Sequence, residues 1–169
     1  MYPEWELNQR KADGKSLEEC LVEKLIQQGM TVTTAESCTG GLIAGTLVNV
    51  PGASDVLNEG YITYSNEAKE RLVRVSHDTL EQYGAVSEQT AREMAEGAVK
   101  AAKADVGLSS TGIAGPGGGT KEKPVGLVYV GCSVRGKTAV KECRFSGDRM
   151  ENRLNTVQTA LAMALEMLG

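Results

Sequence analysis

A serine, a cysteine and a threonine stand side by side at Ser37, Cys38 and Thr39, directly before two glycines. A serine hydroxyl or a cysteine thiol can attack a carbonyl carbon, and glycines let the backbone approach a ligand closely. The stretch TTAESCTGG (residues 33–41) therefore predicts either a nucleophile presented to a ligand or a tight connection without chemistry. The choice depends on whether the chain also supplies a base.

A serine hydroxyl is a weak nucleophile unless a neighbouring base removes its proton. Histidine is the usual base, and the sole histidine of the chain is His77, which stands before Asp78 at the start of an amphipathic segment. That setting favours a surface histidine, so a Ser–His–Asp triad is disfavoured. The remaining option is a lysine base, the Ser–Lys variant of the same arrangement.

Lys69 is the lysine that fits this role. It follows an expected strand in TYSNEAK, in the first turn of a short helix. The positive end of the helix dipole and partial burial would both lower its pKa toward that of a general base. Tyr64 ends the strand, and its hydroxyl could reach the same crevice. Spacing alone favours the alternative, a solvated lysine paired with Glu67 or Glu70.

Two further stretches could bind an anionic ligand. Residues 112–119 (GIAGPGGG) are the most glycine-rich part of the chain, but they match no phosphate-binding motif well, so a flexible surface loop is an equally good interpretation. Arg149, in FSGDR, stands in the first turn of an expected helix, where a cation opposes the helix dipole unless an anion is nearby. Arg149 would suit a phosphate; the alternative is a surface arginine paired with Glu151 or Glu166.

The elements that must position these residues follow from periodicity, caps and turn signals. Capping boxes begin helices at Ser16 and at Asp148, and glycines or Pro-Gly end several segments. The patterns predict helices over 16–29, 39–50, 65–73, 76–84, 87–103 and from 148 onward. They predict strands over 31–36, 56–64, 105–111, 127–134 and 138–145, the last two joined as a hairpin through residues 135–137.

This order of elements predicts an α/β fold, a three-layer α/β/α sandwich in which helices cover both faces of one sheet. The terminal hairpin requires antiparallel neighbours, so the sheet must be a mixed β-sheet. Ligands of open α/β sheets bind beyond the carboxyl ends of the strands. The loops after the first and third strands, residues 37–41 and 112–119, should therefore meet there.

Composition limits the class of protein. The chain has 169 residues, 41% hydrophobic and 24% charged, so we expect one folded domain over 16–169 after an N-terminal lead-in over 1–15. A net charge of −4 disfavours a nucleic-acid partner. The four cysteines show no CxxC spacing, so no metal is expected, and they look like reduced residues of a cytoplasmic protein. We find no transmembrane run and no secretory signal.

Six stretches together resemble a known family. AESCTGG, GYITYSNEAK, GAVSEQTA, TGIAGPGGG, KPVGLVYVG and FSGDR are similar to the motifs of the CinA C-terminal domain, in the same order, from about residue 17 to residue 168. Longer members carry a second domain ahead of this one, so this chain resembles the stand-alone form, the nicotinamide mononucleotide (NMN) deamidase type.

The resemblance implies an amidohydrolase that converts NMN to nicotinic acid mononucleotide and ammonia, in pyridine nucleotide recycling. The family's catalytic serine, lysine and tyrosine correspond to Ser37, Lys69 and Tyr64. Neutral Lys69 would take the proton of Ser37, and Ser37 would attack the carboxamide carbon. The same resemblance implies a small-molecule substrate, no cofactor and a homo-oligomer.

Binding residues follow from the same comparison. We expect backbone N–H groups of the turn Thr39-Gly40-Gly41 to hold the oxyanion and Arg149 to hold the 5′-phosphate of NMN. The glycine loop would line the nucleotide through Thr111, Gly112 and Gly115.

Two alternatives stay open. The family is also linked to competence and DNA-damage phenotypes, so the chain could be a nucleotide-binding or interaction module without turnover. Cys38, in place of Ser37, could be the nucleophile.

Overall fold

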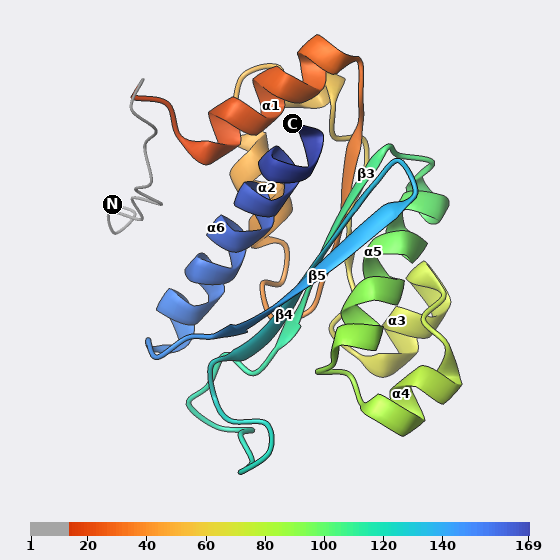
Figure 1. Ribbon diagram of the computed structural model, residues 1–169, viewed down its shortest axis with the longest axis vertical. Coiled ribbons are helices and arrows are strands. Elements are labelled where there is room, and N and C mark those ends of the chain that lie inside the picture. Colours follow the sequence, from red (N-terminus) through yellow and green to blue (C-terminus); the bar gives the residue numbers. More distant parts are fainter. Residues whose placement is uncertain (1–13) are drawn as a thin grey trace.

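A five-stranded mixed sheet organises the chain, with strand order β2-β1-β3-β4-β5 (Figure 1). The computed structural model describes residues 14–169, so the first thirteen residues of the expected lead-in lie outside the described part. β1 runs parallel to β2 and β3, whereas β4 is antiparallel to β3 and β5. The predicted mixed sheet is confirmed. The strands are β1 (Val32–Glu36), β2 (Tyr61–Ile62), β3 (Val106–Gly112), β4 (Leu127–Val134) and β5 (Lys137–Arg144).

Helices cover both faces of this sheet, as the α/β/α prediction requires (Figure 1). One layer holds α1 (Leu17–Gln28), α2 (Leu42–Val48) and α6 (Arg149–Leu168). The opposite layer holds α3 (Asn66–Val73), α4 (His77–Tyr83) and α5 (Glu88–Ala102). A 3₁₀ turn, Ala53–Asp55, joins α2 to the edge strand.

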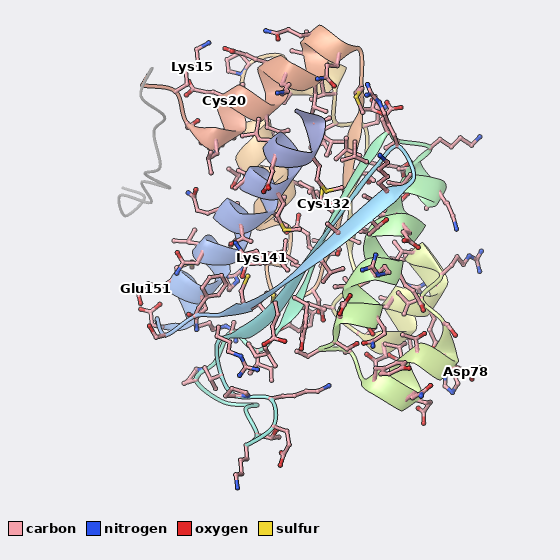
Figure 2. The ribbon with its side chains drawn as sticks, in the orientation of Figure 1. Lys15, Cys20, Asp78, Cys132, Lys141 and Glu151 are labelled. Atoms are coloured by element: carbon pink, nitrogen blue, oxygen red, sulfur yellow. The ribbon has the colours of Figure 1, made fainter. Side chains whose placement is uncertain are left out.

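Each layer buries its own apolar cluster against the sheet. On the α6 side, Leu25 and Leu161 pack with Leu108 of β3, and Figure 2 shows Cys132 in this layer. On the α5 side, Met94 packs with Val73 of α3 and with β1. Burial of each such side chain stabilises the fold by about 1.5–3 kcal/mol. Both helical layers are therefore held by apolar packing against the strands that carry the site.

Both predicted capping boxes are present. Ser16 Oγ accepts from the Glu19 N–H at 3.3 Å, and Glu19 Oε2 accepts from the Ser16 N–H at 2.7 Å. At α6, Asp148 Oδ1 accepts from the Glu151 N–H at 2.9 Å, and Glu151 Oε2 accepts from the Asp148 N–H at 2.7 Å. Each box satisfies two helix-end donors, so these helices begin where the sequence predicts.

Two expected elements are shorter than predicted. The strand expected over 56–64 is reduced to Tyr61–Ile62, since the 3₁₀ turn precedes it and only Leu57 makes an isolated bridge to β1. Residues 58–60 (NEG) favour turns over strands. The helix expected from residue 39 begins at Leu42, because Gly41 has a left-handed backbone with φ +100° that a helix cannot continue through.

A glycine sets the distance between α3 and α5. A Cβ atom built on Gly97 of α5 would lie 1.7 Å from the carbonyl oxygen of Val73, the last residue of α3. Only glycine permits this approach. The contact packs the end of α3 closely against α5, and α3 also carries Lys69.

Candidate active site

The carboxyl ends of the three parallel strands converge on one cavity of about 210 Å³. Ser37 directly follows β1, Tyr64 lies just beyond β2, and Thr111 and Gly112 end β3. The cavity is lined by Ser37, Cys38, Tyr64, Asn66, Lys69, Ala85, Val86, Thr111, Gly112, Ala114 and Arg149. A cavity therefore lies at the strand ends, where the fold class leads us to expect a ligand.

Ser37 and Lys69 lie side by side in the wall of this cavity. The Lys69 Nζ atom lies 3.2 Å from Ser37 Oγ and donates a hydrogen bond to the carbonyl oxygen of Thr63 at 2.8 Å. Lys69 is only 1% exposed. The structure therefore overturns the alternative of a solvated lysine paired with Glu67 or Glu70, which spacing alone had favoured.

Burial tunes this lysine. Removal of the ammonium from water lowers the pKa of Lys69 from 10.5 to about 8. A substantial fraction is then neutral at slightly alkaline pH, and a neutral amine 3.2 Å from a hydroxyl can accept its proton. The pair is chemically equipped to activate a serine.

The position of Lys69 follows from the helix that carries it. Ser65 caps α3 by accepting a hydrogen bond from the Ala68 N–H at 3.0 Å, which places Lys69 on the second turn rather than at the exposed start. Lys69 and Val73 are four residues apart, so they share the buried face of α3. The long lysine stem fills that face, and its amine reaches the cavity.

A buried glutamate holds the turn over residues 37–41, here called the nucleophile turn. Glu36 is 0% exposed, and its Oε2 accepts from Thr39 Oγ1 at 2.6 Å and from the N–H of Gly41 at 3.1 Å. The same carboxylate accepts from the N–H groups of Ile43 and Ala44, both at 2.9 Å. The carboxylate of Glu36 thus occupies the N-terminus of α2, so this helix end does not face a ligand.

Two of the N–H groups that we expected to bind an oxyanion already have acceptors nearby in the chain. The Gly41 N–H is engaged by Glu36, and the Gly40 N–H donates to the carbonyl oxygen of Ser37 at 3.1 Å. Within residues 14–169, no other residue accepts a hydrogen bond from the N–H groups of Cys38 and Thr39. Of the expected turn Thr39-Gly40-Gly41, only the Thr39 N–H therefore has no acceptor among the described residues. The Cys38 N–H has none in another residue either, and Cys38 lines the cavity whereas Thr39 does not.

Replacement of Glu36 tests the strength of this cap. Glu36→Ala should lower the free energy of unfolding by at least about 3 kcal/mol, because buried backbone N–H groups lose a charged acceptor at about 1–3 kcal/mol each. Urea denaturation measures the change. Glu67→Ala, which removes an exposed acidic residue from the first turn of α3, is the matched control and should change stability by less than about 1 kcal/mol. Equal losses in the two variants would contradict a structural role of Glu36.

Cys38 is poorly suited to be the nucleophile. Its side chain borders the cavity but is only 6% exposed. Burial raises the pKa of the Cys38 thiol to about 11, so the reactive thiolate is scarce at neutral pH. The geometry favours Ser37.

Arg149 bridges two sides of the cavity instead of pairing with a carboxylate. Its Nη1 donates to the carbonyl oxygen of Gly115 at 2.7 Å, and its Nη2 lies 3.3 Å from the Tyr64 hydroxyl. The alternative pairing of Arg149 with Glu151 or Glu166 is not observed among residues 14–169.

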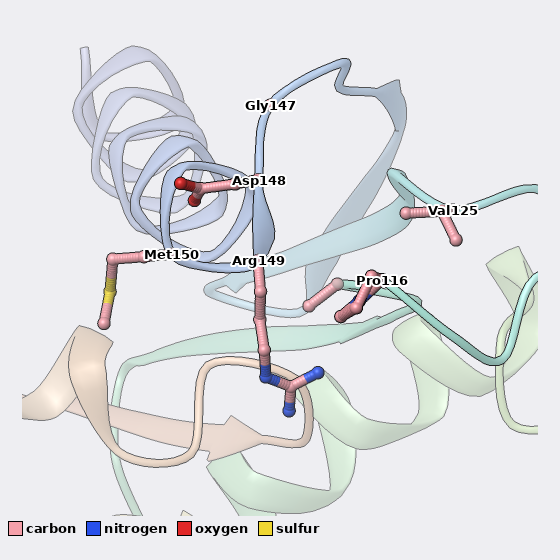
Figure 3. Close-up of a pocket in the computed structure, with 7 residues that line it drawn as sticks. Pro116, Val125, Gly147, Asp148, Arg149 and Met150 are labelled. Atoms are coloured by element: carbon pink, nitrogen blue, oxygen red, sulfur yellow. The ribbon is translucent and has the colours of Figure 1, made fainter.

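A second cavity of about 590 Å³ adjoins the first, and Ala114 and Arg149 border both. Figure 3 shows the Arg149 side chain extending from the start of α6, with Pro116 and Val125 on the neighbouring loop. Met150, Gly147 and Asp148 complete the wall. Arg149 therefore stands at the border between an inner cavity, which contains Ser37, and an outer one.

The structure brings together most of the predicted site residues. Ser37, Tyr64, Lys69, Thr111, Gly112 and Arg149 all line the inner cavity. Thr39, Gly40, Gly41 and Gly115 do not line it, and their roles in binding stay predictions. The Thr111 hydroxyl is already engaged, because it donates to the carbonyl oxygen of Ala85 at 2.7 Å.

Sequence reasoning missed several residues here. Asn66 lines the inner cavity, and its place between Tyr64 and Lys69 in YSNEAK was a usable signal. Glu36 could have been suspected as the only charged residue of β1. Arg153 stands one turn after Arg149, but no local pattern indicated that it would contact the nucleophile turn from α6.

The surface interpretation of His77 is confirmed. Its side chain is 69% exposed and its Nδ1 lies 2.8 Å from Glu70 Oε1. That carboxylate raises the pKa of His77 through a hydrogen bond. Figure 2 shows the neighbouring Asp78 at the outer side of α4, so this segment does not complete a triad at Ser37.

Fold and site together define an α/β/α protein with a serine–lysine pair at the carboxyl edge of a mixed sheet. Residues 14–168 match the model of the CinA C-terminal domain. The chain belongs to this family, and the resemblance seen in its motifs is confirmed.

Relatives of known sequence and structure agree. A protein of Clostridium novyi (strain NT), named for competence-damage induction, is 60% identical over 151 residues, which are 89% of this chain and 36% of that protein. The chain therefore spans only about a third of the length of such curated relatives.

Among solved structures, the competence/damage inducible protein CihA from Agrobacterium tumefaciens is 46% identical, with a TM-score of 0.84 over 91% of this chain and 96% of that one. A CinA superfamily protein from Escherichia coli is 37% identical, with a TM-score of 0.86 over 89% of this chain and 88% of that one. Within residues 14–169, no helix is both long and apolar enough to cross a bilayer.

Proposed function

We propose that this protein hydrolyses the carboxamide of NMN to nicotinic acid mononucleotide and ammonia, with Ser37 as nucleophile and Lys69 as general base. The observation that carries the proposal is the buried Lys69 amine, 3.2 Å from the Ser37 hydroxyl, in a cavity at the strand ends. Membership of the CinA C-terminal domain family supports the choice of substrate.

The chemistry proceeds in two halves. Neutral Lys69 takes the proton of Ser37 as Oγ bonds to the carboxamide carbon, and the carbonyl oxygen becomes an oxyanion held by the Cys38 and Thr39 N–H groups. The carbon–nitrogen bond then breaks, and Lys69 returns the proton to the leaving nitrogen, which departs as ammonia. Water attacks the resulting ester through the same base, which releases the acid and restores Ser37.

The two adjoining cavities suit a substrate with two parts. The pyridine carboxamide would occupy the inner cavity beside Ser37, and the ribose phosphate would extend past Arg149 toward the outer one. Arg149 is the cation at this border, and a guanidinium forms strong charge-assisted hydrogen bonds to phosphate. Tyr64 also lines the inner cavity, and its hydroxyl lies 3.3 Å from Arg149 Nη2, so the catalytic role expected for Tyr64 would place it beside the bound substrate.

The pH dependence should report Lys69. A lysine base works only when neutral, so kcat/KM for NMN should rise about tenfold per pH unit below the pKa and level off above about 8. Initial rates of ammonia release between pH 6 and 9.5 measure this profile. A profile that is flat or falls over this range would be incompatible with a lysine base of this pKa.

Ammonia release from NMN by the purified protein is the direct test. Release, with nicotinic acid mononucleotide formed in equal amount, would support the proposal. Absence of release would refute it. If NMN nevertheless raised the thermal unfolding midpoint of the inactive protein, the cavity would be a nucleotide-binding site without turnover.

A further inference from the structure

One arginine grips the backbone of the nucleophile turn from outside the cavity. Arg153, on the second turn of α6, donates from Nε to the carbonyl oxygen of Cys38 and from Nη2 to that of Thr39, both at 3.0 Å. These are successive carbonyls immediately after the serine. Arg153 does not line either cavity, so it does not contact a ligand held there.

Because peptide units are planar, the hydrogen bonds from Arg153 to these carbonyl oxygens also fix the directions of the N–H groups in the same peptide units. The C=O and N–H of a trans peptide point in opposite directions within one rigid plane. The hold on the Cys38 carbonyl therefore orients the Thr39 N–H away from Arg153. The hold on the Thr39 carbonyl orients the Gly40 N–H.

A second step reaches the residue next to the serine. The Gly40 N–H donates to the Ser37 carbonyl oxygen at 3.1 Å. That carbonyl shares its peptide plane with the Cys38 N–H, so the Cys38 N–H is oriented as well. Arg153 thus orients both N–H groups that could bind an oxyanion. It orients the Thr39 N–H directly and the Cys38 N–H through Gly40.

We propose that Arg153 is a positioning residue that presets the Cys38 and Thr39 N–H groups as the oxyanion site for Ser37. The inference rests on the proposed acyl transfer to Ser37, but not on NMN being the substrate. A planar guanidinium can hold two neighbouring carbonyls in one fixed geometry, which a lysine ammonium cannot. Donors that are preset in this way need no reorganisation when charge develops on the substrate oxygen.

The matched comparison is Arg153→Met against Arg92→Met. Arg92 is also half-buried and donates from Nη1 to a backbone carbonyl, that of Thr138 at 2.8 Å, on the far side of the fold. Arg153→Lys is the conservative variant. Each protein is assayed for kcat and KM with NMN, for the stoichiometry of NMN binding and for the thermal unfolding midpoint. The rate at which a fluorophosphonate labels Ser37, forming an O–P bond with loss of fluoride, gives a readout that does not require NMN.

The expected result is a fall in kcat of about 100-fold in Arg153→Met per competent binding site, since loss of one oxyanion donor typically costs 10²–10³ in kcat. KM and the binding stoichiometry should stay unchanged, Arg153→Lys should recover only part of kcat, and Arg92→Met should retain it. Labelling of Ser37 should slow in parallel. Unchanged kcat and labelling in Arg153→Met, or a loss fully matched by loss of binding sites, would overturn the inference and leave the proposed function standing.

Failure of the proposed function would look different. Wild-type protein that released no ammonia but was labelled at Ser37, with slower labelling in Arg153→Met, would refute the substrate and support the role of Arg153. Equal labelling of the two proteins, or no labelling of either, would overturn the role of Arg153.

Discussion

Replacement of Ser37 by alanine is expected to reduce ammonia release from NMN by at least about 1,000-fold, because removal of a serine nucleophile leaves only what the binding site and the oxyanion donors contribute. NMN should still bind, since the deleted hydroxyl is one small contact in a cavity lined by many residues. Kinetics of ammonia release and calorimetric titration of NMN measure the two effects separately.

Cys38→Ala is the control for this variant, since it removes the neighbouring candidate nucleophile. It should keep kcat within about tenfold of the wild type, because the thiol is buried and its pKa is raised to about 11. Iodoacetamide should likewise leave the wild type active. An active Ser37→Ala protein together with an inactive Cys38→Ala protein would transfer the nucleophilic role to the cysteine.

Lys69→Met should change activity and stability in opposite directions. Activity should fall by at least about 1,000-fold, because the serine loses its base. Stability at pH 7 should rise, because methionine fills similar space at a site that is 1% exposed without burying an ammonium. Urea denaturation and ammonia release on the same preparation measure both quantities.

The lowered pKa of Lys69 also predicts how the stability of the wild type changes with pH. The folded-state pKa of Lys69 is lowered to about 8, whereas the unfolded value is near 10.5. Between these values the unfolded chain binds more protons than the folded one, so the wild type should gain stability as pH rises from about 8 toward 10.5. Lys69→Met should lack this part of the slope.

Lys69→Arg serves as the second control. Arginine cannot lose its proton, so this variant should be inactive and less stable than the wild type at pH 7. A Lys69→Met protein that was markedly less stable than the wild type at pH 7 would show that the buried amine stabilises the fold, contrary to the expectation.

The sequence by itself determined the sheet class and most element boundaries. Several of these features are local, because they involve residues only a few positions apart in the sequence. They are the two capping boxes, the glycine that ends α1 and the terminal hairpin. Local hydrogen bonds and backbone preferences determine such features, so a short stretch of sequence is enough to predict each of them. The order of the six sequence motifs was likewise enough to predict the family, which the match over residues 14–168 confirms.

The choice of base was not determined in this way. The serine and lysine are 32 residues apart, and a helix lysine next to glutamates favours a solvated side chain on local grounds. Lys69 lies on the buried face of α3 together with Val73, which packs closely against Gly97 of α5. The family resemblance had assigned the role of base to Lys69, but only the tertiary structure shows that this lysine is buried beside Ser37 rather than exposed to water.

The donors around the nucleophile turn show the same division. The glycines were visible in the sequence, but Glu36 occupies the N-terminus of α2 and Arg153 reaches the turn from 115 residues away. Sequence determined which residue types were available. Tertiary structure decided which N–H groups remained available for a ligand, because a buried hydrogen-bond donor takes the acceptor that packing places beside it.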